Sequence, residues 1–228
     1  MGLGAFLVYF AIILIIPIWA QRKVKSAYKK YSQVAASSGM TGAQVARKIL
    51  DDNGLYDVTV EPIRGELTDH YDPRAKAVRL SEKNYYGNSV AGAAVAAHEV
   101  GHAMQDAEEY AFLRFRHALV PVANFGSNTS FIILIAGFLM GMSGLVLLGI
   151  IFMAAAVLFQ VVTLPVEFNA SSRAMGQMVS SGIIRNDEER ETRKVLDAAA
   201  LTYVAAALVA VMELVRFVLM YIGMNSDD

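Results

Sequence analysis

The chain alternates between long apolar runs and charged segments. Leu3–Ala20 is an uncharged, apolar run of about the length that a helix needs to cross a bilayer. No basic stretch precedes this run and no small-residue cleavage site follows it. We therefore predict a retained signal anchor rather than a cleaved signal peptide.

A second apolar block, Leu119–Val166, contains no charged residue and is too long for one membrane-spanning helix. The stretch Met140–Gly144 favours a turn. We expect a tight hairpin of two spans, at residues 122–141 and 144–164. The alternative, one long buried helix of a soluble protein, is disfavoured by so long an uncharged run.

A fourth apolar block, residues 198–224, is interrupted only by Glu213 and Arg216. A charge inside a span costs about 2.5–3.5 kcal/mol on insertion scales, so such residues usually pair. These two residues are three positions apart and share one helical face. We expect an intramembrane ion pair that could dock this helix against the hairpin.

Composition and charge orient these spans. The 228 residues are 55% hydrophobic and 18% charged, against about 25% charged in an ordinary soluble domain. Every lysine and arginine except Arg216 lies at residues 22–116 or 173–194. The positive-inside rule then places both segments in the cytoplasm and both termini outside. A net charge of −1 argues against nucleic-acid binding.

These patterns predict a mainly α membrane protein with four transmembrane helices and a small α+β cytoplasmic domain. We divide the chain into a first transmembrane helix at 1–21, a cytoplasmic segment at 22–118, a transmembrane hairpin at 119–164, a second cytoplasmic segment at 165–197 and a fourth transmembrane helix at 198–224.

The first cytoplasmic segment begins with a basic stretch, Lys23–Ala36, that we expect to rest on lipid headgroups. Thr41 is a good N-cap for a helix that ends at Asn53-Gly54. Three strands and a helix of small residues are predicted to follow, at 58–63, 67–71, 77–81 and 89–106.

The second cytoplasmic segment is predicted to be helical. Pro165 is expected to begin a helix, and Ser181-Gly182 to break it. Asn186 and the acidic residues after it favour the start of another helix. We expect this helix to run directly into the fourth span.

The strongest chemical signal is His98-Glu99-Val100-Gly101-His102, an HExxH motif. On a helix, its two histidines project from one face and can share a zinc ion, while the glutamate can act as general base. The chain has no cysteine, and its other histidines are His70 and His117, so any zinc site must use nitrogen and oxygen ligands. The alternative is a metal-free buried helix, in which the intervening glutamate would be costly.

A catalytic zinc site needs a third protein ligand and one open position. Glu167 is the best candidate, because it is the only acidic residue between Glu109 and Asp187. Two membrane crossings also return it to the membrane face of His102. Glu108 and Glu109 are weaker rivals, since they lie nearly two turns further along the same helix.

Three stretches together resemble one known family. HEVGHAMQ (98–105), LTDHYDPR (67–74) and PVEFNASSRAM (165–175) are similar to segments of the YugP-type neutral zinc metallopeptidases, a family of small bacterial membrane proteins. The resemblance covers nearly the whole chain. It implies a zincin-like cytoplasmic domain, one Zn²⁺ ion, and a place in the bacterial cytoplasmic (inner) membrane.

More distantly, the chain is similar to the HtpX and CAAX-prenyl-protease gluzincins. Their ligand glutamate opens an E-x-x-A-D motif, which maps onto Glu167. Here Ser171 stands where those enzymes have aspartate. The carboxylate that would orient a zinc histidine must therefore come from elsewhere, and Asp69, Asp72 or Asn169 could substitute.

The gluzincin resemblance also implies a mechanism. Glu99 would take a proton from a zinc-activated water and deliver it to the leaving amine. One side chain would help to stabilise the oxyanion, and the candidates are His70, Tyr71, Arg173 and Tyr203. The hairpin at 67–81 could pair with an extended substrate by β-augmentation.

The sequence thus favours a membrane zinc metalloendopeptidase that acts on a peptide or membrane-protein substrate at the cytoplasmic face. The alternative is a non-catalytic membrane scaffold that holds zinc for structure, which would need a fourth protein ligand and no general base. A transporter that uses Glu213 and Arg216 is disfavoured, because the four spans show neither a repeat nor a broken helix.

Overall fold

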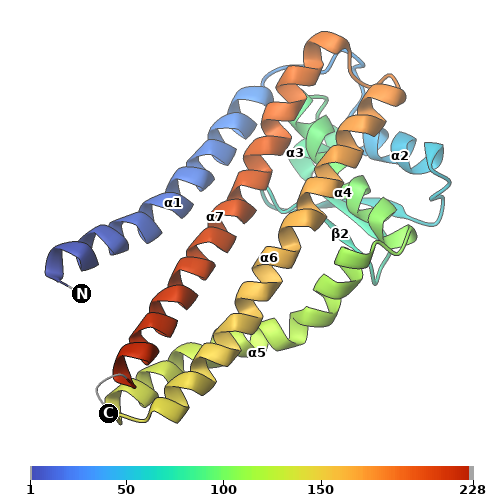
Figure 1. Ribbon diagram of the computed structural model, residues 1–228. Coiled ribbons are helices and arrows are strands. Elements are labelled where there is room, and N and C mark those ends of the chain that lie inside the picture. The colour runs from blue at the N-terminus through green and yellow to red at the C-terminus, as the bar shows by residue number, and fades with distance from the viewer. Residues whose placement is uncertain (1, 226–228) are drawn as a thin grey trace. The chain divides into compact units, whose positions relative to one another are not determined.

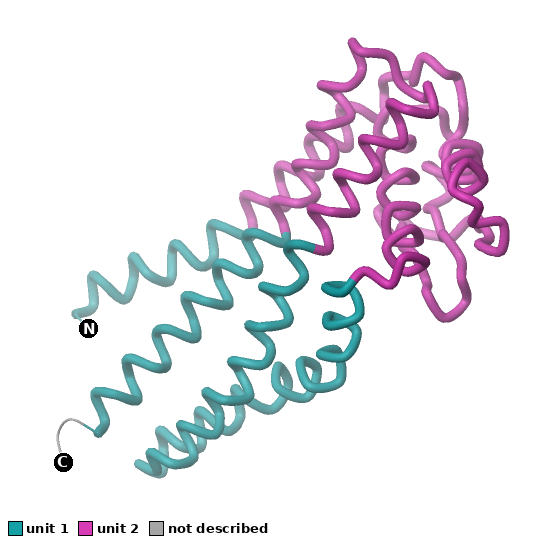
Figure 2. Tube along the Cα trace, turned by 45° about the vertical axis from the view of Figure 1, so that its right-hand side comes forward, with its two compact units in different colours: residues 1–17, 111–165, 203–228 teal, residues 18–110, 166–202 magenta. Residues whose placement is uncertain are grey.

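The structure, a computed structural model, describes residues 2–225 of the chain (Figure 1). Helices dominate it, and a small sheet accompanies them. The chain divides into two compact units (Figure 2), which we describe separately. The elements are, in chain order, α1 (Leu3–Tyr31), α2 (Gly42–Asp52), β1 (Thr59–Ile63), β2 (His70–Asp72), β3 (Ala77–Ser81), α3 (Glu82–Tyr86), α4 (Val90–Ala107), α5 (Ala111–Leu139), α6 (Ser143–Ser180) and α7 (Asn186–Met224).

The first unit holds the apolar parts of the longest helices and comprises Met1–Pro17, Ala111–Pro165 and Tyr203–Asp228. Within the described residues, α1, α5, α6 and α7 are long and apolar enough to cross a membrane, by length and composition. Large apolar side chains such as Leu3 and Ile132 are more than half exposed on them. A surface of this kind is suited to lipid rather than to water. The prediction of four membrane-spanning helices agrees with this unit.

The expected tight hairpin is formed by α5 and α6. Gly141, with a φ of +64°, occupies the turn between Leu139 and Ser143. A Cβ atom added to Gly126 would lie 2.5 Å from the backbone oxygen of Phe152. The two helices therefore approach as closely as small residues allow in membrane helix pairs.

Pro165 does not begin a helix, contrary to our expectation. It lies inside α6, which continues without interruption to Ser180. A proline removes one backbone hydrogen bond, but ending the helix among the buried residues Thr163, Val166 and Glu167 would leave several carbonyl groups without a partner. Continuing the helix therefore costs less. The predicted break at Gly182, with φ +65°, and the start of α7 at Asn186 are both confirmed.

The second unit, Ile18–Tyr110 and Val166–Thr202, contains a three-stranded sheet in the order β1-β3-β2. The central strand, β3, pairs in parallel with β1 and antiparallel with β2. The predicted second strand begins at His70 rather than at Leu67, because Leu67 has a φ of +57°, which a strand cannot accommodate. Periodicity does not predict α3, whose five residues are too few to show one.

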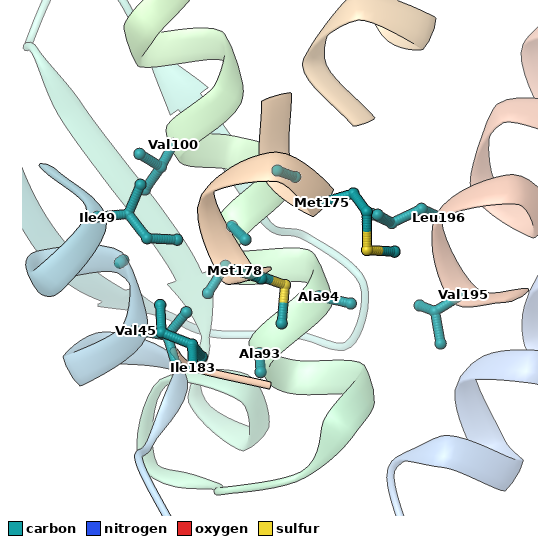
Figure 3. Close-up of a cluster of buried hydrophobic side chains, with 14 of the residues drawn as sticks. Val45, Ile49, Ala93, Ala94, Val100, Met175, Met178, Ile183, Val195 and Leu196 are labelled. Carbon is teal, nitrogen blue, oxygen red and sulfur yellow. The ribbon is translucent and has the colours of Figure 1, made fainter. Parts of the chain in front are cut away.

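The helices α2 and α4 form as the sequence predicts. Thr41 caps α2 through a reciprocal capping box with Gln44, and Asn53 ends the helix. Ser89 caps α4 by accepting a hydrogen bond from the backbone of Gly92. The apolar faces of both helices meet the ends of α6 and α7 in the main core (Figure 3), which includes Val45, Ile49, Val100, Met178, Ile183 and Leu196.

Candidate metal centre

The helix α4 places both motif histidines on one face. His98 and His102 are four residues apart, and their ring centroids lie 4.8 Å from each other. Each side chain is only 12% exposed. Most of α4 consists of small buried residues, which let neighbouring elements surround the histidines closely.

The helix α6 brings Glu167 to the same point. Its Oε2 atom lies 3.3 Å from Nε2 of His98 and 3.5 Å from Nε2 of His102. One ligand atom from each of the three side chains lies within 4.8 Å of the other two. The Glu167 side chain is 3% exposed. The structure thus brings together the three residues that the sequence predicts as metal ligands, from two segments more than sixty residues apart.

A close contact between backbones makes this meeting possible. A Cβ atom on Gly101 would lie 2.6 Å from the backbone oxygen of Ala170 in α6. Any side chain at position 101 would therefore push α4 and α6 apart. Gly101 sits between the two histidines in the motif, and Ala170 is one helical turn from Glu167. The absence of a side chain at Gly101 thus sets the distance between the ligands.

The other ring nitrogen of each histidine has a partner of its own. His98 Nδ1 lies 3.2 Å from Ser171 Oγ, and His102 Nδ1 lies 3.0 Å from Gln105 Oε1. Both Nε2 atoms are thereby directed at Glu167. Histidines that bind a metal usually hold their second nitrogen in this manner. Two nitrogens and one carboxylate oxygen also match the donors of a catalytic zinc site. The residues present therefore fit a zinc ion.

Gln105 is a site residue that our sequence reasoning does not identify. Its side chain is fully buried, and its amide nitrogen donates to the backbone oxygen of Val166 and to Asn169 Oδ1, at 2.8 and 2.9 Å. It therefore fixes His102 and the chain beside Glu167 at once. The only signal in the sequence is a glutamine three residues after the second motif histidine, on nearly the same helical face.

The network continues from Asn169 to the surface. Arg173 donates to Asn169 Oδ1 at 2.7 Å and makes two 2.7 Å hydrogen bonds to the Glu108 carboxylate. The guanidinium lowers the pKa of Glu108. Asn169 and Arg173, which we considered as orienting or oxyanion residues, thus belong to a network that braces the centre. Glu108 itself pairs with Arg173.

The residues expected to replace the missing aspartate have other roles. Asp69 accepts hydrogen bonds from Ser81 and Asn84, and Asp72 accepts them from Arg79 and from the turn that follows it. Both acids stabilise the sheet and its loops. The serine that stands at the aspartate position contacts His98 directly.

The remaining oxyanion candidates are His70, Tyr71 and Tyr203, and the first two have partners of their own. His70 Nδ1 lies 2.9 Å from the backbone oxygen of Thr68. Tyr71 donates a 3.0 Å hydrogen bond to Asp106, and burial together with this carboxylate raises the pKa of its phenol. Tyr203 belongs to the first unit.

The Glu99 side chain, unlike the other polar side chains around the metal centre, is not held by a hydrogen bond within residues 2–225. Its side chain is partly exposed, and among the described residues it makes no side-chain hydrogen bond or ion pair. Burial lowers the pKa of His102, but the hydrogen bond to Glu167 and the charge of Glu99 outweigh this and leave that pKa raised. The Glu99 carboxylate is therefore near the centre while remaining accessible.

In the first unit, Glu213 and Arg216 form the expected ion pair, with an N–O distance of 2.6 Å. A third partner is Tyr9 of α1, which donates a 2.5 Å hydrogen bond to Glu213. The Arg216 guanidinium also lies 4.5 Å from the ring centroid of Phe217. The pair thus connects α7 to α1, whereas we expected it to dock this helix against the hairpin.

Four apolar helices and a buried group of two histidines and one glutamate define a multi-pass membrane protein with side chains able to hold a metal ion. The family described as "Putative neutral zinc metallopeptidase" matches residues 6–222, and the chain belongs to this family.

A curated relative agrees with this assignment. The "Putative membrane protease YugP" of Bacillus subtilis (strain 168) is 58% identical over 210 residues, which cover 92% of this chain and 93% of the relative. No solved structure matches the chain.

Proposed function

We propose that this protein is a membrane-embedded zinc metalloendopeptidase. The observation that carries the proposal is the convergence of His98, His102 and Glu167, with the second nitrogen of each histidine held by Gln105 or Ser171. Three protein ligands leave one position for water or substrate, which is the arrangement of a catalytic rather than a structural zinc site.

The residues around the centre have distinct roles in hydrolysis. One zinc ion would supply Lewis-acid chemistry, polarising the peptide carbonyl and making water acidic. Glu99 is the general base, because its carboxylate is near His102 and has no competing partner among the described residues. It accepts a proton from water and donates it to the leaving amine.

The substrate is proposed to be an extended peptide segment of a soluble or membrane protein. The strand β2 is at the edge of the sheet and pairs with β3 on one side only. An extended chain could add to its free side and be held by backbone hydrogen bonds.

A test uses three purified proteins: the parent, Glu99→Gln and Glu167→Ala. Zinc per chain is measured by mass spectrometry, and hydrolysis is measured on a flexible fluorogenic peptide. We expect Glu99→Gln to keep its zinc and lose activity by about a hundredfold or more, because general acid–base catalysis contributes roughly 10²–10⁴-fold. Glu167→Ala should lose both zinc and activity.

The scaffold alternative predicts a different result. If zinc stabilises the fold without catalysis, the parent protein would bind zinc and show no hydrolysis that depends on Glu99. Full zinc retention in Glu167→Ala would refute the ligand assignment. Asp69→Asn serves as a control, because Asp69 contacts the sheet and loops and neither histidine.

A further inference from the structure

A groove of about 640 Å³ lies in the second unit, where the last turns of α1 face the loop before β2 and the start of α3. Its charged lining consists of Lys25, Lys29 and Lys83 against a single acid, Glu66. The groove shares no lining residue with the metal centre.

The positive charge of the groove is only partly neutralised. Lys83 Nζ is 3.6 Å from Glu66, but both side chains are more than half exposed, so the pair is weak. Lys25 and Lys29 form no ion pair within residues 2–225. Three lysines and one glutamate therefore line one cavity, which leaves a net excess of two positive charges. A groove of this charge is suited to a phosphate.

A bilayer that covers the apolar run of α1 would place the near end of the groove, at Lys25, in the layer of lipid headgroups. Its apolar run ends at Ala20, and Trp19 marks this boundary with Lys23 Nζ 6.0 Å from its ring. Lys25 lies five residues further on, about 8 Å along the helix axis. The headgroup layer is roughly 5–8 Å thick on each side of a bilayer. Because helical side chains lean toward the N-terminus, Lys25 and Lys29 lean toward this layer.

An unusual leucine completes the groove. Leu67 has a φ of +57°, a conformation that costs a non-glycine residue free energy, and it is 40% exposed on the groove wall. An exposed leucine beside lysines can bind a molecule that is charged at one end and apolar at the other, because each end then contacts a side chain of its own kind. The opposite wall is rigid, because Tyr28 is buried and donates a 2.8 Å hydrogen bond to Asn84.

We infer that this groove is a binding site for the headgroup of an anionic phospholipid, in the leaflet where α1 leaves the membrane. Lys25, Lys29 and Lys83 bind the phosphate, and Leu67 contacts the glycerol and the first carbons of the acyl chains. The occupant is a lipid rather than a free phosphate, because the groove combines these cations with an exposed apolar side chain next to a membrane-spanning run.

The single tryptophan of the chain allows a direct test. Trp19 lies within two turns of Lys25 on the same helix. The full chain is placed in phosphatidylcholine nanodiscs that contain a trace of phospholipid dansylated on its acyl chain. Energy transfer from Trp19 to dansyl is compared for phosphatidylglycerol and phosphatidylcholine. We expect about threefold or more enrichment of phosphatidylglycerol around the parent protein.

Matched variants distinguish lipid binding in the groove from a general attraction of anionic lipids to the basic residues of the protein. Lys25→Gln/Lys29→Gln/Lys83→Gln should abolish the enrichment, and the corresponding triple arginine variant should retain it. The control Lys30→Gln/Lys48→Gln/Lys194→Gln removes the same charge outside the groove, leaves the Lys23 contact with Trp19 intact, and should leave the enrichment unchanged. Equal loss in both glutamine variants, or no enrichment in the parent, would overturn the proposal. Because the readout is lipid binding, it is independent of peptidase activity.

Discussion

At the scale of single residues, the centre depends on neutral side chains as much as on its charged ones. Ser171 and Gln105 each contact one histidine, and neither belongs to the HExxH motif. Gln105 acts on two elements, since it also binds the backbone oxygen of Val166 next to Glu167. A buried amide with this many partners has little freedom to move.

We predict that Gln105→Leu weakens zinc binding by roughly 10–100-fold, because His102 loses the partner that orients its ring. The measurement is competition for zinc with a chelator of known affinity. Gln177→Leu is the matched control: Gln177 is also a helical glutamine with a side-chain partner, but it contacts Asn53, away from the histidines. Equal affinity in the two variants would contradict the role assigned to Gln105.

At the scale of elements, the sequence predicts most of the helices, but it does not predict how α4 and α6 cross. Apolar runs and caps predict α1, α2, α4 and the hairpin of α5 and α6, because these signals are local in the sequence. The motif spacing likewise predicts that the two histidines share a face. The role of Gln105 and the parallel pairing of β1 with β3 arise from contacts between distant segments, which periodicity does not record. Pro165 misleads because its neighbours in α6 are buried, and a buried helix end would leave several carbonyl groups without a partner.

The crossing of α4 and α6 gives a prediction of its own. Gly101→Ala places a Cβ atom 2.6 Å from the Ala170 backbone oxygen, so α6 must shift and carry Glu167 away from the histidines. We expect a loss of stability of about 1–3 kcal/mol from overpacking and weaker zinc binding. Thermal unfolding and zinc content measure the two effects.

Gly176→Ala provides the control for this crossing. Gly176 also lies in a helix, α6, but a Cβ atom there meets nothing within 4 Å. This variant should keep its zinc and be unchanged or slightly more stable, since alanine favours the helix by up to about 1 kcal/mol. If Gly101→Ala binds as much zinc as Gly176→Ala, the close approach of α4 and α6 is not required for zinc binding.

At the scale of the whole molecule, the distribution of basic residues predicts an orientation in the membrane. All lysines and arginines but one lie in the two segments that supply the metal-centre residues. We propose that these segments face the cytoplasm, with both termini and the tip of the α5–α6 hairpin outside.

The absence of cysteine makes this orientation testable with single introduced thiols. Met142→Cys, in the exposed hairpin turn, should react with a membrane-impermeant maleimide in intact cells. Ser180→Cys, exposed at the end of α6, should react only after the cells are made permeable. The opposite pattern would invert the proposed topology.

Three helices, α1, α6 and α7, pass from one unit to the other, and α1 and α6 each have a proline at the boundary. The first unit ends at Pro17 in α1 and at Pro165 in α6. Each proline leaves one helical hydrogen bond unmade, so these two helices are locally weakened where the apolar part meets the part that holds the metal ligands. The length of the apolar part can therefore change in evolution without a change in the part that holds the metal ligands. An apolar run can lengthen or shorten to suit a bilayer of different thickness while the spacing of the two histidines and the glutamate is preserved.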